Sequence, residues 1–257
     1  MPSYREADVA YRSVEVLGRT LSACFDDRWE VLVVDDGGGD FPPDAWAADE
    51  RIKLLPMQEN RGKGAAVRTG ILAATGQARI FTDADLPYHV DLIPVMASYL
   101  LEGRYHLVAG DRNLPQSDYP GSPSLARRTL SGVATFFIGT LVTGGFFDTQ
   151  CGIKGIQGRV AELLFPMLTI DRFAFDIELV YLCLRFNCDV KRLPVRLVED
   201  GTPSTVRPIV DSARSLRDIL RIKRNALRGK YSSPALDELV WADYEARLAE
   251  QIARPSG

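Results

Sequence analysis

The run Val-Leu-Val-Val at 31–34 constrains the fold most strongly, because it is continuous, mostly β-branched and free of polar alternation. Such a run is typical of a strand that is buried on both faces of a parallel sheet. Parallel strands need crossover helices, and the residues before this run supply one. Apolar residues recur there at helical spacing, and they predict a helix over 9–24.

The rest of the chain continues this alternation. Further strands are predicted at 52–55, 78–82, 106–109, 152–157 and 190–198. Helices are predicted at 65–75 (closing at a left-handed Gly76), 176–185 and 211–230. The sequence therefore predicts an α/β fold with a mostly parallel central sheet flanked by helices. One domain is expected over 1–230, with halves at 1–112 and 113–230, and 231–257 is expected to form a tail or an extra helix.

Composition excludes several classes of protein. The 257 residues are 46% hydrophobic and 25% charged, as in soluble globular proteins, and the net charge of −3 gives no general case for nucleic-acid binding. The four cysteines form no CxxC pair, so reduced thiols are expected in place of a zinc site. The apolar stretch 133–147 is interrupted by glycines and is shorter than the roughly 20 residues of a spanning helix. No signal peptide is visible, and we expect a cytoplasmic protein.

Three predicted strands end in acidic or Gly-rich loops, at Asp35-Asp36, at Asp83-Ala84-Asp85 and at 110–112. Ligands of open α/β sheets bind outside the carboxyl ends of the strands, so we place the site at this shared edge. Two carboxylates that flank a small residue offer hard oxygen ligands for Mg²⁺ or Mn²⁺. A metal there would neutralise the charge of a nucleotide diphosphate, and the alternative is a pair of solvated turn residues.

The sequence Gly62-Lys63-Gly64 opens a predicted helix. Backbone N–H groups and a lysine at a helix start suit an anion, although the Walker spacing is absent. The alternative is an ordinary helix entry with an exposed lysine.

These motifs, in this order, resemble family 2 glycosyltransferases, and within them the polyprenyl- or dolichyl-phosphate glucosyltransferase type. The most specific matching blocks are Asp-Thr-Gln-Cys-Gly at 148–152 and Phe-Asp-Ile-Glu-Leu at 175–179. The resemblance extends to about Lys230 and implies a GT-A-like nucleotide-sugar-binding fold.

The resemblance also implies roles for individual residues. Those expected to line the nucleotide-sugar pocket are Pro2, Tyr4, Glu6, Asp35, Asp36, Lys63, Asp83, Ala84 and Arg112. Asp85 is expected to be the main metal ligand, together with Asp83. The family places an apolar strand before Pro2, and nothing precedes Met1 here, which predicts either a start assigned too late or a truncated enzyme. Arg5 stands where the family has Asn.

The implied reaction is inversion by direct attack of the acceptor. A phosphate acceptor is already ionised and needs little help from a base, whereas a hydroxyl acceptor requires one. Asp176 is the first candidate base and Asp148 the second, and a structural aspartate in a first helical turn is the alternative for Asp176. The residues expected to border the acceptor are Gln150, Lys154 and Arg207.

The predicted last helix carries two stripes. The basic stripe consists of Arg214, Arg217, Arg221, Arg224 and Arg228, and the apolar stripe, expected to pack on the domain, consists of Leu216, Ile219, Leu220 and Leu227. The basic stripe suits the anionic cytoplasmic face of a membrane, and an ordinary amphipathic surface helix is the alternative.

The sequence thus predicts a metal-dependent inverting enzyme that moves a hexose, glucose from UDP-glucose, to a polyprenyl or dolichyl phosphate. Two alternatives remain open. One is a glycosyltransferase that acts on a soluble hydroxyl acceptor, and the other is a non-catalytic protein that binds nucleotide sugars.

Overall fold

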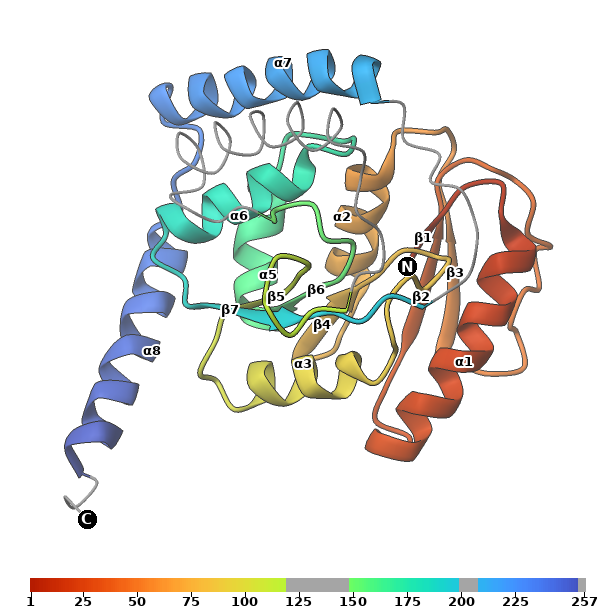
Figure 1. The fold of residues 1–257 in the computed structure, drawn as a ribbon, viewed down its shortest axis with the longest axis horizontal. Coiled ribbons are helices and arrows are strands. Elements are labelled where there is room, and N and C mark those ends of the chain that lie inside the picture. Colours follow the sequence, from red (N-terminus) through yellow and green to blue (C-terminus); the bar gives the residue numbers. More distant parts are fainter. Residues whose placement is uncertain (119–147, 199–207, 254–257) are drawn as a thin grey trace.

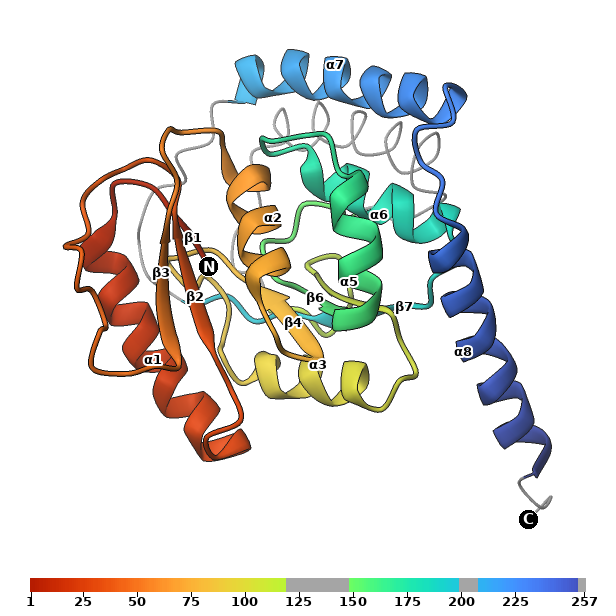
Figure 2. The same ribbon diagram turned by 180° about the vertical axis from the view of Figure 1, so that it is seen from behind.

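The fold is taken from a computed structural model that describes residues 1–118, 148–198 and 208–253, with side chains of the last range described from Arg217 onward. The apolar segment 133–147 and Arg207, which the sequence analysis singled out, lie outside the described residues. Figures 1 and 2 show two sheets side by side, with helices on both faces of each.

The first sheet is parallel and contains β1 (Pro2–Ser3), β2 (Val31–Asp35) and β3 (Ile52–Pro56) in that order. Every residue of β2 is buried, as its unbroken apolar run predicts. Helix α1 (Ala7–Phe25) covers one face of this sheet and α2 (Lys63–Ala73) covers the other (Figure 1).

The second sheet has the order β4-β6-β5-β7 and contains β4 (Ala78–Phe81), β5 (Leu107–Asp111), β6 (Lys154–Gln157) and β7 (Val190–Pro194). Strand β6 runs antiparallel to both of its neighbours, while β5 and β7 are parallel. The prediction of a mostly parallel α/β architecture is confirmed, with β6 as the exception. Because β6 is reversed, Lys154 at its start pairs with Phe81 at the carboxyl end of β4. The segment before β6 therefore lies at the same end of the sheet as Asp83.

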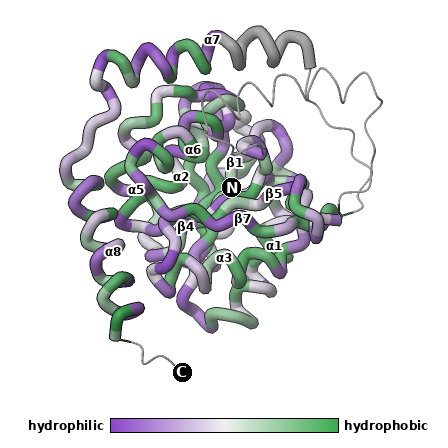
Figure 3. Tube along the Cα trace, turned by 60° about the vertical axis from the view of Figure 1, so that its left-hand side comes forward, coloured by the Kyte–Doolittle hydropathy of each residue, from purple (hydrophilic) through white to green (hydrophobic). Residues whose placement is uncertain are grey.

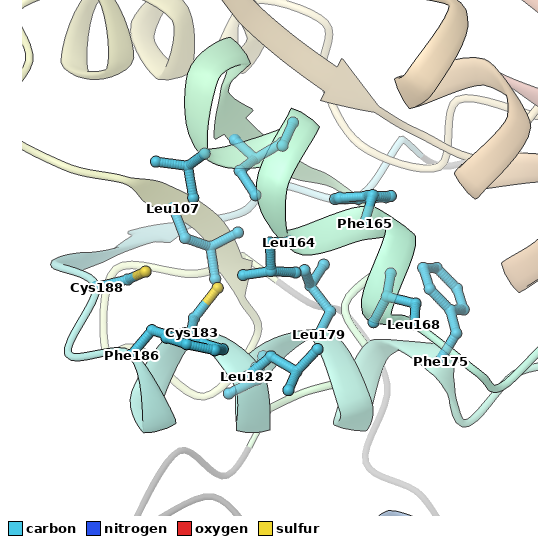
Figure 4. Close-up of a cluster of buried hydrophobic side chains, with 14 of the residues drawn as sticks. Leu107, Leu164, Phe165, Leu168, Phe175, Leu179, Leu182, Cys183, Phe186 and Cys188 are labelled. Carbon is cyan, nitrogen blue, oxygen red and sulfur yellow. The ribbon is translucent and has the colours of Figure 1, made fainter. Parts of the chain in front are cut away.

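Two hydrophobic cores lie on opposite faces of the second sheet. One lies beneath α1 and α3 (Leu92–Leu101), and the larger one lies among α2, α5 (Gly158–Leu164) and α6 (Phe175–Arg185). Strand β5 alternates between them, since Leu107 faces the larger core and Val108 the other. Figure 4 shows Leu164 of α5 against Leu179 and Leu182 of α6. A 3-10 turn (Phe165–Met167) follows α5.

The end of α2 differs from the prediction. The helix ends at Ala73, Ala74 is extended, and Gly76 is not among the residues with positive φ in the described part of the chain. The prediction of a left-handed Gly76 was therefore wrong. The carboxylate of Glu30 accepts hydrogen bonds from the Thr75 and Gly76 backbone N–H groups, at 2.6 and 3.2 Å, so no left-handed glycine is needed.

Helix α7 (Pro208–Leu227) turns a different face to the body than its leucine spacing predicted. Ile222 and Asn225 are buried, whereas Leu220 is 62% and Leu227 90% exposed. The expectation that these two leucines pack on the domain was wrong. The physical reason is polar: the Asn225 amide donates to the Thr169 hydroxyl and the Tyr231 hydroxyl, and both of these groups also contact the buried carboxylate of Glu178.

The segment expected to be a tail or an extra helix contains α8 (Pro234–Ala253). Leu236 and Val240 of its first turns lie in the larger core, as does Tyr231 just before it. The remainder of α8 extends away from the body toward the C-terminus (Figures 1 and 2).

Candidate functional site

A partly exposed ion pair lies where the start of α2 meets the carboxyl ends of β2 and β4. The Lys63 ammonium lies 2.5 Å from a carboxylate oxygen of Asp83, and the two side chains are 15% and 34% exposed. Burial disfavours the charged form of Lys63, but the negative charges of Asp83 and Asp176 outweigh it and raise its pKa. The lysine is therefore a fixed positive charge at the mouth of the site.

The Asp83–Asp85 loop is held by contacts on both sides. The hydroxyl of Ser13 on α1 donates to the carbonyl of Ala84, whose side chain is buried. The Asp83 carboxylate rests against Gly152, where an added Cβ would come within 2.2 Å of its oxygen. Glycine at 152 is thus what admits the carboxylate. Asp85, the next acid along, is exposed.

Glu6 joins these acids. Burial raises the pKa of the Glu6 carboxyl, and the charges of Asp85 and Asp83 raise it further. Burial and Asp83 likewise raise the pKa of Asp85. Within the described ranges, no group of three or more His, Cys, Asp or Glu side chains is arranged to hold a metal. Two carboxylates completed by substrate phosphates are the usual way that proteins bind Mg²⁺, and Asp83 and Asp85 fit that arrangement.

Asp35 and Asp36 are both buried at the end of β2, and each holds a loop with both of its oxygens. Asp35 accepts the N–H groups of Gly38 and Gly39 at 2.7 and 2.9 Å. Asp36 accepts those of Arg61 and Gly62, both at 2.8 Å. The backbone of Gly62 has φ +109°, which favours glycine, and it lies against the Asp171 carbonyl. Asp36 therefore positions the loop that presents Lys63.

Arg112 and Asp148 form a second ion pair, just beyond the carboxyl end of β5. The Asp148 carboxylate accepts the Arg112 backbone N–H at 2.7 Å and two guanidinium N–H groups, at 3.0 and 2.6 Å. Burial lowers the pKa of Arg112, but these contacts outweigh it and raise the pKa above its ordinary value. Asp148, the second candidate base, is buried and engaged on both oxygens.

Lys154 and Asp176 form a third pair, which is fully buried. The Lys154 ammonium lies 2.5 Å from the Asp176 carboxylate and donates to the Cys151 carbonyl at 2.6 Å. Both residues are buried, so the structure does not present Lys154 to solvent as an acceptor contact would require. Burial raises the pKa of Asp176, while the positive charges of Lys154 and Lys63 oppose the rise.

The remaining predicted residues that the structure describes are Pro2, Tyr4 and Gln150. Pro2 forms β1, Tyr4 is 41% exposed, and Gln150 is exposed on the segment that leads into β6. Arg207 is not among the described residues. Cys24 is an exposed free thiol, and the other three cysteines are buried free thiols, as the prediction of reduced cysteines requires.

One group of charged residues beside the start of α2 was not predicted from the sequence. Asp171 accepts from Arg68 at 2.6 Å and from Arg61 at 3.1 Å, and its backbone carbonyl accepts the N–H of Ala65 in the first turn of α2. Burial raises the pKa of Asp171, but the hydrogen bonds from the two arginines outweigh it and lower the pKa. No local motif marks these residues, because their spacing along the chain exceeds 100 positions.

Comparisons with known proteins agree with this architecture. The family model described as Glycosyl transferase family 2 matches residues 1–156. A dolichyl-phosphate beta-glucosyltransferase of Dictyostelium discoideum is 32% identical over 78% of this chain and 64% of its own length. One of Drosophila melanogaster is 33% identical over 69% of this chain and 58% of its own length. The chain thus spans about three fifths of these curated relatives.

Solved structures show the same fold. Glucosyl-3-phosphoglycerate synthase from Mycobacterium tuberculosis, in complex with Mn²⁺, UDP-glucose and phosphoglyceric acid, superposes with a TM-score of 0.58 at 18% identity. The match covers 91% of this chain and 78% of that one. A mannosyl-3-phosphoglycerate synthase from Rubrobacter xylanophilus gives a TM-score of 0.53 at 16% identity, covering 91% and 76%. The expected GT-A-like fold is confirmed.

Proposed function

The chain belongs to glycosyl transferase family 2, and from that premise we propose that it transfers a hexose, glucose from UDP-glucose, to a polyprenyl phosphate. The observation that carries this proposal is the open edge where Lys63, Asp83 and Asp85 meet. The dolichyl-phosphate beta-glucosyltransferases that this chain resembles supply the sugar and the acceptor class.

Donor binding rests on the charges at that edge. Asp85 and Asp83 would hold Mg²⁺ or Mn²⁺, which supplies charge neutralisation for the diphosphate that leaves. Lys63 stands beside them as a fixed cation at a helix start, where backbone N–H groups also favour phosphate. Asp36 fixes the loop that carries this lysine.

Acceptor chemistry follows from the state of the two candidate bases. Asp148 is held by Arg112 and Asp176 by Lys154, so neither candidate is a free carboxylate that could take a proton from a hydroxyl. A phosphate monoester needs no such base, because its oxygen is already ionised. These ion pairs favour a phosphate acceptor over the soluble hydroxyl acceptor that the sequence left open.

Calorimetric titration tests the donor half. The chain should bind UDP-glucose more tightly with Mn²⁺ than without it, and should discriminate against GDP-mannose. Asp85→Ala should reduce the Mn²⁺-dependent affinity at least tenfold and leave the melting temperature unchanged, because Asp85 is exposed. Glu59→Ala, an exposed acid elsewhere on this edge, is the matched control. Unchanged Mn²⁺ dependence in Asp85→Ala would contradict the metal assignment.

Product analysis tests the acceptor half. With radiolabelled UDP-glucose, label should pass to polyprenyl phosphate and not to the corresponding polyprenol. Transfer to the free alcohol would favour the hydroxyl acceptor. Tight donor binding with no transfer to either would favour a non-catalytic protein.

We further propose that α7 contacts an anionic membrane surface. No helix among the described residues has the length and apolar character needed to cross a bilayer. Helix α7 exposes Arg217, Arg221 and Arg224 together with Leu220 and Leu227, and Arg228 directly after the helix is also exposed. A basic face next to exposed apolar side chains is typical of helices that lie in a lipid interface. The helix runs across the end of the molecule where α2 begins, near the open edge (Figures 1 and 2).

Vesicle flotation tests this contact. Replacing Arg217, Arg221 and Arg224 with Gln should weaken binding to phosphatidylglycerol vesicles by about 1 kcal/mol for each charge. The matched control replaces three exposed arginines in and just after α1, namely Arg12, Arg19 and Arg28. If the two triple variants lost vesicle binding equally, the loss would follow from net charge alone. That result would contradict the assignment of the membrane contact to α7.

A further inference from the structure

The segment 168–172, which precedes α6, lies directly against the start of α2. Helices α2 and α6 lie side by side around the larger core (Figures 1 and 3). A Cβ added at Gly62 would come within 2.8 Å of the Asp171 carbonyl oxygen. One added at Gly64 would come within 2.7 Å of the Ile170 carbonyl oxygen. Both glycines of the Gly-Lys-Gly motif are therefore needed for this segment to pack on the backbone of α2.

Asp171 joins this segment to α2 through its side chain and its backbone. Its carboxylate accepts from the Arg68 guanidinium at 2.6 Å and from that of Arg61 at 3.1 Å. Its backbone carbonyl accepts the Ala65 N–H at 2.9 Å. These partners lie on both sides of Lys63 in the chain. Asp171 therefore holds the chain both before and after the lysine.

The same segment is fixed to α6 by the carboxylate of Glu178, which is fully buried. This carboxylate accepts the backbone N–H groups of Thr169 and Ile170, both at 2.8 Å, and the Thr169 hydroxyl at 2.7 Å. Asp171 is the next residue, so it follows a stretch whose backbone is already held. The segment thus forms a fixed connection between the interior of the molecule and the first turn of α2.

Lys63 depends on such support because its ion pair with Asp83 is partly exposed. Partly exposed ion pairs contribute little energy of their own, and lysine carries its charge at the end of a flexible aliphatic chain. Asp36 holds the backbone before the lysine through two N–H groups. Asp171 holds the first turn of α2 after it. The two aspartates together fix the backbone from which the lysine side chain extends.

We propose that Asp171 is a positioning residue for the donor, which keeps Lys63 directed at Asp83. The carboxylate of Asp171 is engaged by two arginines, so it acts through the lysine and not by contact with the donor. The diphosphate of the nucleotide sugar then binds to a lysine that is already in place, which reduces the entropy lost on binding. The proposal rests on the donor site proposed above, whereas the position of the lysine can be tested without any donor.

A double-mutant cycle tests whether Asp171 acts through Lys63. Asp171→Ala should weaken Mn²⁺-dependent binding of UDP-glucose about fivefold. In a Lys63→Met background the same substitution should change the affinity by about twofold at most, because the side chain that it positions is gone. Asp49→Ala is the matched control, since Asp49 also binds an arginine with both oxygens, but just before β3. No loss in Asp171→Ala, or equal losses in the two backgrounds, would overturn the proposal.

Lysine acylation tests the position of Lys63 in the chain without donor or metal. An N-hydroxysuccinimide ester, followed by peptide mass spectrometry, reports the rate at each lysine. The Lys63 side chain is 15% exposed in its pair with Asp83, so release from that pair in Asp171→Ala should raise its rate several-fold relative to the exposed Lys53. An unchanged rate, or an equal rise in Asp49→Ala, would overturn the positioning role. A rise in a chain that binds no donor would support this role and contradict the proposed function.

Discussion

Two lysine–aspartate pairs contact the segment before β6, with the same chemistry and the same 2.5 Å separation. The Lys63–Asp83 pair is partly exposed at the carboxyl edge, where a ligand can compete for either member. The Lys154–Asp176 pair is buried, and its lysine also donates to the Cys151 carbonyl. Burial, and not residue type, therefore distinguishes a charge that is accessible to a ligand from one that stabilises the fold.

The largest expected effect comes from breaking the buried pair. Lys154→Ala leaves Asp176 unpaired in the interior and should lower the free energy of unfolding by about 3–5 kcal/mol. Urea denaturation measures this loss. The double variant Lys154→Met/Asp176→Leu removes both charges and should regain most of the stability. A double variant as unstable as the single one would show that packing, and not the unpaired charge, is responsible.

A smaller effect is expected where Gly152 lies against Asp83. Gly152→Ala places a methyl group within 2.2 Å of the Asp83 carboxylate, which must then move away from Lys63. We expect Mn²⁺-dependent affinity for UDP-glucose to fall about tenfold, which is about 1.4 kcal/mol. Titration calorimetry measures it. Ala84→Gly, which removes a methyl group beside the same acid, provides a control for general loosening of the loop.

The open pair itself should matter little for stability. Lys63→Met should change the free energy of unfolding by about 1 kcal/mol or less, because partly exposed ion pairs contribute little. Donor affinity should nevertheless fall. A loss of stability as large as that of Lys154→Ala would abolish the distinction between the two pairs.

The smallest effect is the pH dependence of stability that comes from the buried His106. Burial lowers the pKa of His106, against the opposing charges of Asp189 and Asp243. The unfolded chain therefore binds a proton at a pH where the folded chain does not. Stability is fully present above the ordinary histidine pKa of about 6.5 and falls below it, by at most about 1.4 kcal/mol per pH unit.

Thermal melts between pH 5 and 8 measure this dependence. His106→Asn keeps an acceptor for the Asp189 N–H and should flatten it. An unchanged slope in His106→Asn would assign the dependence to other groups.

The sequence was most informative where chemistry and local pattern coincide. The β2 run predicted a strand that is buried throughout, and the structure confirms it. Asp36 after β2 holds the loop before Lys63, and Lys63 pairs with Asp83 after β4. Local pattern carries no information about pairing direction, so the antiparallel β6 was not foreseen. Nor does it report burial of a charge, which is why Lys154 resembled an acceptor contact.

Helix α7 shows a second limit. Its leucine spacing defined an apolar stripe, but the face that packs on the body contains Asn225. That choice depends on Thr169, Glu178 and Tyr231, which are distant in the chain or lie in the turn beyond the helix. A helical pattern identifies the stripes of a helix. Which stripe is buried depends on the residues elsewhere in the fold that pack against it.

The reversed strand also bears on synthesis of the chain at the ribosome. Among the described strands, β4 pairs only with β6, and β5 pairs with β6 and β7. When residue 112 leaves the ribosome, neither β4 nor β5 has a described partner, and 40 or more residues must follow before β6 arrives. Pairings of such long sequence separation form slowly. Asp83 and Asp85, which follow β4, are therefore synthesised early, but the sheet that positions them forms late, and a fragment that ends at 112 should not hold them in place.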